Sequence, residues 1–184
     1  RSSARGQAAA LAARQEVTDT ARPTYAQVIG VVNSVAGEDD YVVVSSGGLA
    51  GEIVMNWRSK AVATFDCEYG FSCMGYEVAG AWGAAMARHD GEGEVFSLVG
   101  DGSYLMLNSE IYSSVLSGRK FILLVCDNAG FAVIERLQVN QGGNSYNNML
   151  RDSRGPNSDV RVDFVAHAAS LGAHATRAAS IPEL

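Results

Sequence analysis

The sequence predicts an α/β fold, a doubly wound and mostly parallel sheet with helices on both faces. Short, continuous apolar runs recur along the chain and end in Gly, Asp, Asn or Ser, which is typical of strands buried on both faces of a parallel sheet. Segments with apolar residues at helical spacing, or with many small residues, lie between these runs. The alternation of the two patterns predicts strands joined by covering helices.

The first half of the chain is expected to hold two helices and two strands after a polar start. Residues 1–22 contain four arginines and no clear buried face, so they are expected to be a linker or a solvated helix. Apolar residues recur at helical spacing over 25–35. The runs 41–45 and 61–65 predict strands, and the Ala- and Gly-rich segment 76–87 predicts a helix packed closely on the sheet.

The second half is expected to add two strands and two helices. Residues 94–99 predict a strand that ends in Gly-Asp-Gly-Ser, and 105–116 have the spacing of a helix. The continuous apolar run 121–126 predicts the last strand and ends in Asp-Asn-Ala-Gly-Phe. Residues 138–157 contain five Asn and three Gly, so a long polar loop is expected, and 164–171 return to helical spacing.

Length and composition limit the classes of function. A length of 184 residues suits one domain, expected over 23–184. A net charge of −6 argues against nucleic acid or an anionic membrane as partner, and no apolar run approaches the roughly 18 residues of a membrane span. We therefore expect a cytoplasmic protein. Its three cysteines form no C-x-x-C pair, so they predict no zinc site or disulfide framework and are expected to be reduced and buried.

The two ends of the sequence suggest a piece of a longer protein. The chain begins at Arg1 without a Met, and it stops just after Pro182, at a place where proline usually opens a new element. We therefore expect this chain to be an excised piece of a longer protein.

Two polar residues follow neighbouring buried strands and predict a metal site. Asp101 comes directly after the run 94–99, and Asn128 follows the run 121–126. One β-α-β crossover would place both side chains at the same edge of a parallel sheet, where ligands bind. Hard oxygen ligands suit Mg²⁺, which proteins hold with one or two side chains and with phosphate oxygens of a ligand. The glycines beside Asp101 would let a phosphate approach the backbone.

Each motif also has a purely structural interpretation. Gly-Asp-Gly and Asp-Asn-x-Gly are both favoured turn sequences when they occur singly. Their position after two successive buried strands favours a Mg²⁺-diphosphate site over two unrelated turns.

The context LVGDGS…LLVCDNAGF resembles the thiamine diphosphate motif of the pyruvate decarboxylase and acetolactate synthase superfamily. The resemblance covers most of 24–184 and implies the domain that binds the cofactor's diphosphate. It implies that Asp101 and Asn128 ligate Mg²⁺ through their side chains and Gly130 through its carbonyl. The residues implied to bind the cofactor are Ser46, Gly47, Gly48, Leu49, Ser72, Met74, Gly102, Ser103 and Phe131. Many members have Asn at the position of Asp127, which precedes the ligand.

The resemblance also implies roles for the segment that carries Met74. Its side chain would wedge between the two rings of the cofactor and force a bent shape. The carbonyl of Ser72 would accept a hydrogen bond from the aminopyrimidine. Glu77 and Glu110 lie in the same matched strings and are expected to be carboxylates of a helix surface or first turn.

Longer strings resemble one branch of the superfamily, the trihydroxycyclohexanedione hydrolases of myo-inositol degradation. These strings are YGFSCMGYE at 69–77, GDGSYLMLNSE at 100–110 and RLQ at 136–138. This branch implies hydrolytic opening of the ring of 3D-(3,5/4)-trihydroxycyclohexane-1,2-dione to 5-deoxy-glucuronate. Two alternatives stay open: an acetolactate synthase-like or other 2-oxo acid decarboxylase or carboligase, and a non-catalytic Mg²⁺-diphosphate binding module.

The family places its activating Glu in a separate pyrimidine-binding domain, so no catalytic residue is assigned to this chain. The resemblance implies an active site shared with that domain of a partner subunit, in a homodimer or homotetramer. The chain alone is expected to bind the cofactor weakly with Mg²⁺ and to show no turnover.

Overall fold

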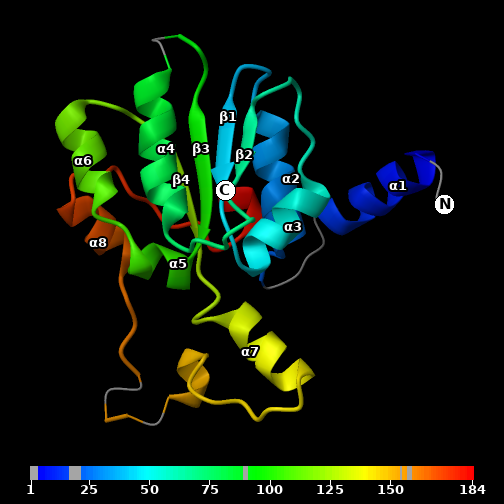
Figure 1. The fold of residues 1–184 in the computed structure, drawn as a ribbon, viewed down its shortest axis with the longest axis vertical. Helices are drawn as coiled ribbons and strands as arrows, with labels where there is room; N and C mark the ends of the chain where they lie inside the picture. Colours follow the sequence, from blue (N-terminus) through cyan, green and yellow to red (C-terminus); the bar gives the residue numbers. More distant parts are fainter. Residues whose placement is uncertain (1–3, 17–21, 89–90, 154, 157–158) are drawn as a thin grey trace.

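The framework of the computed structural model is a four-stranded parallel sheet (Figure 1). The described residues are 4–16, 22–88, 91–153, 155–156 and 159–184. The strands are β1 (Tyr41–Val44), β2 (Phe65–Cys67), β3 (Val95–Gly100) and β4 (Ile122–Cys126), in the order β2-β1-β3-β4. From β1 the chain moves outward to β2 and then returns past β1 to β3. The sheet is therefore doubly wound, as predicted, with its topological switch point between β1 and β3.

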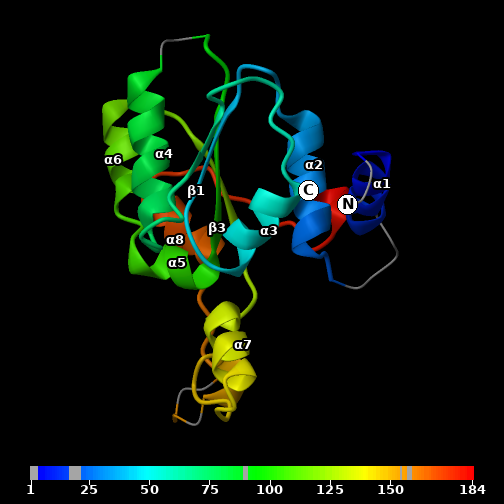
Figure 2. The same cartoon turned by 45° about the vertical axis from the view of Figure 1, so that its right-hand side comes forward.

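Helices cover both faces of this sheet (Figures 1 and 2). The α-helices are α1 (Ala4–Gln15), α2 (Tyr25–Val35), α3 (Gly48–Asn56), α4 (Tyr76–Ala87), α5 (Asp101–Met106), α6 (Glu110–Ser117), α7 (Ala132–Asn140) and α8 (Phe164–Ser170), with 3₁₀ turns η1 (Leu150–Asp152) and η2 (Ile181–Glu183). The helices α2 and α3 pack on one face, and α4, α6 and α8 lie on the other. The helix α1 leans on the outside of α2.

The alternation of side chains in β1 shows why both faces need cover. Val42 and Val44 pack with α2 and α3, whereas Val43 between them packs against Ala81 of α4. All three valines are at most 1% exposed. A strand with apolar side chains on both faces is stable only in the middle of such a three-layer stack, so the continuous run of valines places the strand at the centre of the fold.

One segment lies outside the three layers, beyond the carboxyl ends of the strands (Figure 1). We call residues 131–153, which contain α7 and η1, the arm. A β-bridge joins Gly130 to Met149 at its base, where Phe131 N–H donates to Asn148 O at 2.7 Å. Within the arm, the buried carboxylate of Glu135 accepts hydrogen bonds from Ser145 and Asn148. We call these hydrogen bonds from Ser145 and Asn148 to Glu135 the polar clip, and they stabilise the arm in place of a large apolar core.

Several expected elements are wrong in detail. The helix expected over 105–116 is divided into α5 and α6, because the chain leaves the helix at Leu107 and Asn108 Nδ2 turns back to donate to Tyr104 O at 2.9 Å. The helices α3 and α7 were not expected, and the polar loop expected from residue 138 begins inside α7. The second strand starts only at Phe65.

Two further expectations concern the start of the chain and the cysteines. The helix α1 has no buried residue, which agrees with a solvated helix over part of 1–22; residues 1–3 and 17–21 lie outside the described residues. Cys67 and Cys126 are partly buried, but Cys73 is exposed, because it lies in the loop between β2 and α4 rather than under a helix. The expectation that all three are buried is wrong.

Candidate functional site

A cavity of about 120 Å³ opens at the carboxyl ends of β1, β3 and β4, beside the switch point of the sheet. All of the site residues expected from the sequence line it except Ser72. Ser72 is exposed and has a φ of +54°, a left-handed conformation that is uncommon outside glycine. The topology thus brings together loops that lie more than 80 positions apart in the sequence.

Three buried oxygen atoms in this cavity have no hydrogen-bond partner among the described residues. They are Oγ of Ser46, Oδ1 of Asp101 and Oδ1 of Asn128. The other carboxylate oxygen of Asp101 accepts a hydrogen bond from Gly130 N–H at 2.8 Å. Leaving a buried acceptor unpaired costs about 1–3 kcal/mol, so three together indicate a place for a ligand. Carboxylate, amide and hydroxyl oxygens are the donor set of a hard divalent cation, and the residues therefore fit Mg²⁺.

Tyr25, at the start of α2, sets the orientation of the Asn128 side chain. Asn128 Nδ2 donates to the Tyr25 hydroxyl at 2.6 Å, which leaves the amide oxygen Oδ1 facing the cavity. This assignment of the amide follows from its hydrogen-bond partner. Burial raises the pKa of Tyr25, while the hydrogen bond from Asn128 and the charge of Arg136 lower it. The sequence motifs did not assign Tyr25 to the site.

The carboxyl group of Asp101 is held in an environment that penalises its charge. Asp101 is 5% exposed, and burial raises its pKa, with a smaller contribution from the neighbouring charge of Asp127. The hydrogen bond from Gly130 N–H acts in the opposite direction. A cation bound at the unpaired oxygen would offset the cost of burying this charge.

Glycine is required at two positions beside Asp101. A Cβ on Gly102 would lie 2.6 Å from the ring of Phe131, so a side chain there would displace the ring from the cavity wall. Gly130 has a φ of +144°, and a Cβ there would lie 2.5 Å from Asn148 O at the base of the arm. Both glycines let the arm approach the Asp101 turn closely.

The loop that carries Met74 is held by two carboxylates. Glu68 accepts hydrogen bonds from Phe71 N–H at 3.0 Å and from Cys73 N–H at 2.8 Å, and both lower the pKa of Glu68. Glu77 accepts from Gly75 N–H at 2.9 Å and from Ser103 Oγ at 2.9 Å. The second carboxylate therefore connects the Met74 loop to the turn that contains Asp101.

Glu77 lies in the first turn of α4, which is one of the two positions expected for it. It is not on the surface: its side chain is only 1% exposed and accepts hydrogen bonds from Gly75 N–H and from Ser103 Oγ of α5. Burial raises the pKa of Glu77. Glu110, in contrast, lies in the first turn of α6, partly exposed, and accepts hydrogen bonds from Ser109 Oγ.

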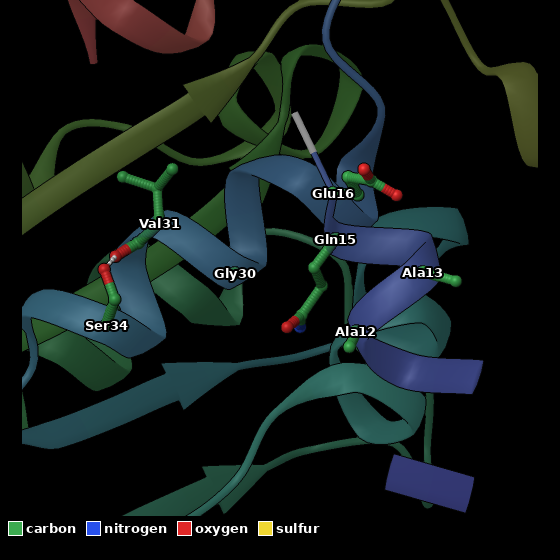
Figure 3. Close-up of a pocket in the computed structure, with 7 residues that line it drawn as sticks. All are labelled: Ala12, Ala13, Gln15, Glu16, Gly30, Val31 and Ser34. Atoms are coloured by element: carbon green, nitrogen blue, oxygen red, sulfur yellow. Dashed lines mark hydrogen bonds between the residues drawn. The ribbon is translucent and has the colours of Figure 1, made fainter. Parts of the chain in front are cut away.

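A larger hollow, of about 630 Å³, lies between α1 and α2 (Figure 3). Its lining consists of Ala12, Ala13, Gln15, Glu16, Gly30, Val31 and Ser34. None of the unpaired buried atoms found in the described residues belongs to this lining. Size alone therefore does not decide between the two hollows, and the gathered unpaired oxygens favour the smaller one as the candidate site.

Comparisons with known proteins identify the family of this domain. Residues 49–184 match the family model of the thiamine pyrophosphate enzyme, C-terminal TPP binding domain. The chain is 40% identical over 166 residues to 3D-(3,5/4)-trihydroxycyclohexane-1,2-dione hydrolase 2 of Bacillus cereus, which covers 88% of this chain and 26% of that protein. It is 39% identical over 153 residues to a 3D-(3,5/4)-trihydroxycyclohexane-1,2-dione hydrolase of Shouchella clausii, covering 83% of this chain and 23% of that protein.

A solved structure has the same fold. The thiamine diphosphate-dependent 4-hydroxybenzoylformate decarboxylase of Rhodococcus jostii RHA1 matches with a TM-score of 0.77 and 19% identity, over 91% of this chain and 30% of that one. The chain spans about a quarter of the length of the curated relatives it matches. None of the helices among the described residues is long and apolar enough to cross a membrane.

Proposed function

This chain belongs to the thiamine pyrophosphate enzymes, whose C-terminal TPP binding domain it matches, and we propose that its enzyme hydrolyses a C–C bond of a cyclic 1,2-diketone. The proposed substrate is 3D-(3,5/4)-trihydroxycyclohexane-1,2-dione and the product 5-deoxy-glucuronate, a step of myo-inositol degradation. The observation that carries this proposal is the 40% identity to a curated hydrolase of that name. The solved decarboxylase, at 19% identity, supports the fold alone.

We propose that the cavity binds Mg²⁺ and the diphosphate of the cofactor. Asp101 and Asn128 would hold the ion through their unpaired oxygens, and Gly130 through its carbonyl. Two side-chain ligands suit Mg²⁺, which takes its remaining ligands from phosphate and water. Ser46–Leu49 and Gly102–Ser103 would contact the diphosphate, because both segments line the same cavity as the proposed metal ligands.

Thiamine diphosphate, when bound, supplies the carbanion chemistry that breaking a C–C bond requires. The contribution of this chain is to bind and orient. Met74 lines the cavity on the loop held by Glu68 and Glu77, so it is positioned to press against the rings of the cofactor. Ser72 would act through its carbonyl, which accepts Met74 N–H at 3.1 Å and keeps a second lone pair. Phe131 would close the wall opposite Gly102.

We also propose that the active site is completed by a pyrimidine-binding domain of a partner subunit, in a cytoplasmic homodimer or homotetramer. The size of the cavity supports a second wall. Its volume of about 120 Å³ is well below the roughly 300–1,000 Å³ of a pocket that encloses a small molecule. The activating Glu would come from that domain.

The test is consumption of the cyclic dione by the full-length enzyme, with pyruvate as the competing substrate. Each reaction would be run with and without thiamine diphosphate and Mg²⁺. We expect loss of the dione that depends on both cofactors, and none with this chain alone. Turnover of pyruvate instead would assign the enzyme to the acetolactate synthase branch, and turnover of neither would favour a non-catalytic module.

A further inference from the structure

We propose that Arg136 on α7 is the cationic contact of the cofactor's terminal phosphate, and that it makes this site select a diphosphate over a monophosphate. The inference deepens the proposed Mg²⁺-diphosphate site and rests on it. Arg136 lies outside the set of residues that the sequence motifs assigned to cofactor binding.

The charges that line the cavity point to this role. The charged residues of its lining are Glu52, Asp101 and Arg136. Glu52 forms an ion pair with Arg14, and Asp101 is the proposed metal ligand. Within the described part of the chain, the side chain of Arg136 makes no hydrogen bond or ion pair. A diphosphate ester and Asp101 together carry more negative charge than one divalent cation neutralises, so a further cation in the cavity would stabilise the bound state.

The position of the guanidinium group is the second observation. Nη2 of Arg136 lies 3.9 Å from the point where a Cβ on Gly48 would be. Gly48 is the first residue of α3, a nine-residue helix that begins without a side-chain cap. The first amides of a helix favour an anion, and here a guanidinium group faces the same place. Two independent features that favour negative charge therefore meet at the loop proposed to bind the diphosphate.

The arm explains how Arg136 is held there. The helix α7 starts directly after Phe131, whose ring packs over Gly102. Glu135, the residue before Arg136, is buried and hydrogen-bonded to Ser145 and Asn148. The backbone of Arg136 is therefore held by the start of α7 at Phe131 and by the hydrogen bonds of Glu135. Its side chain is exposed, so replacing it should leave the fold intact.

The experiment compares binding of thiamine diphosphate and thiamine monophosphate, in Mg²⁺, by the full-length apoenzyme and its variants in isothermal titration calorimetry. The variants are R136Q, R136K and the control R151Q, which removes a charge from the exposed Arg151 of the same arm, outside the cavity. We expect R136Q to weaken diphosphate binding about tenfold or more, the scale of a charge-assisted hydrogen bond, and to leave monophosphate binding within about twofold. R136K should restore part of the loss, because it keeps the charge without the planar fork.

Unchanged diphosphate affinity in R136Q, or equal losses for both ligands, would overturn the role of Arg136. The role would also be overturned if R151Q weakened diphosphate binding as much as R136Q, because the effect would then be one of net charge. If the unmodified enzyme shows no Mg²⁺-dependent binding of thiamine diphosphate, the proposed metal-diphosphate site itself is wrong, and the inference fails with it.

Discussion

The two sides of the cavity differ in whether their polar side chains have hydrogen-bond partners. On the metal side, Ser46, Asp101 and Asn128 each leave an oxygen without a partner among the described residues. The other side carries Met74. There, Glu68 and Glu77 each accept two hydrogen bonds, with donor–acceptor distances of 2.8–3.0 Å. Both sides contain buried or constrained carboxylates, but among the described residues only the first side leaves buried side-chain oxygens unpaired.

This difference distinguishes side chains that are expected to bind a ligand from side chains that position the loop around them. An unpaired buried oxygen is costly unless a ligand completes it, so it marks where an ion or a phosphate is expected. A carboxylate that accepts hydrogen bonds from the N–H groups of a loop restrains the backbone of that loop. The comparison therefore predicts large losses of binding from changes on the metal side and smaller ones from changes on the Met74 side.

The largest effect is expected from Asp101→Ala. Removing a metal ligand should cost more than the roughly 10–100-fold that a change beside a ligand costs. We expect loss of over about a hundredfold in Mg²⁺-dependent affinity for thiamine diphosphate, measured by calorimetry on the full-length enzyme. Affinity within about threefold of the unmodified enzyme would remove Asp101 from the site.

Tyr25→Phe should give the next largest effect, because it removes the acceptor that fixes the amide of Asn128. The amide would then be free to turn its nitrogen toward the cation. A loss of about tenfold in Mg²⁺ affinity at saturating cofactor is expected. Tyr112→Phe, at an exposed position on α6, is the matched control and should change nothing. Equal results for the two variants would mean that Tyr25 does not orient the ligand.

A smaller effect is expected from the connection between Glu77 and Ser103. Glu77→Ala and Ser103→Ala should each weaken cofactor binding, and the double variant should lose less than the sum of the two, by about 0.5–3 kcal/mol. The shared hydrogen bond at 2.9 Å is the physical reason. Strict additivity in this cycle of cofactor dissociation constants would show that the two sides of the cavity are independent.

The smallest effect concerns the stability of the fold as a function of pH. Because burial raises the pKa of Glu77 in the folded chain, its protonated form is favoured there. The contribution of Glu77 to the free energy of unfolding is complete below the pKa of this group in the unfolded chain, about 4.3. It is lost as the pH rises through the higher pKa that Glu77 has in the folded chain. Glu77→Gln should flatten the curve of unfolding free energy over this window in denaturant titrations. A Glu77→Gln curve with the same slope as that of the unmodified protein would contradict this prediction.

The sequence alone predicted the sheet, and it singled out the residues that are proposed to bind the metal, because both depend on local patterns. Asp101 follows β3 directly and Asn128 lies two residues after the end of β4, so their position at the carboxyl edge follows from the strands themselves. Tyr25 carries no such signal, since 103 positions separate it from Asn128 and only tertiary packing brings them together. Their roles as ligand and orienting residue stay predictions that the variants above test.

The wrong assignments also have physical reasons. A first-turn carboxylate is usually solvated, whereas Glu77 is buried and accepts hydrogen bonds from Gly75 N–H and from Ser103 Oγ of α5. The helix α3 was missed because a glycine run is typical of a loop, whereas here Gly47 is the residue that opens the helix. The helix α7 was missed because it does not pack on the main core. Hydrogen bonds to the buried Glu135 stabilise the arm instead, and these connect residues that lie apart in the sequence.

The most direct test of the account is a crystal structure of the full-length enzyme with thiamine diphosphate and Mn²⁺ in place of Mg²⁺. The account predicts an anomalous peak about 2.0–2.3 Å from Oδ1 of Asp101 and Oδ1 of Asn128, bridged to the diphosphate. An ion bound elsewhere, or a diphosphate bound while these two oxygens contact no metal, would contradict it.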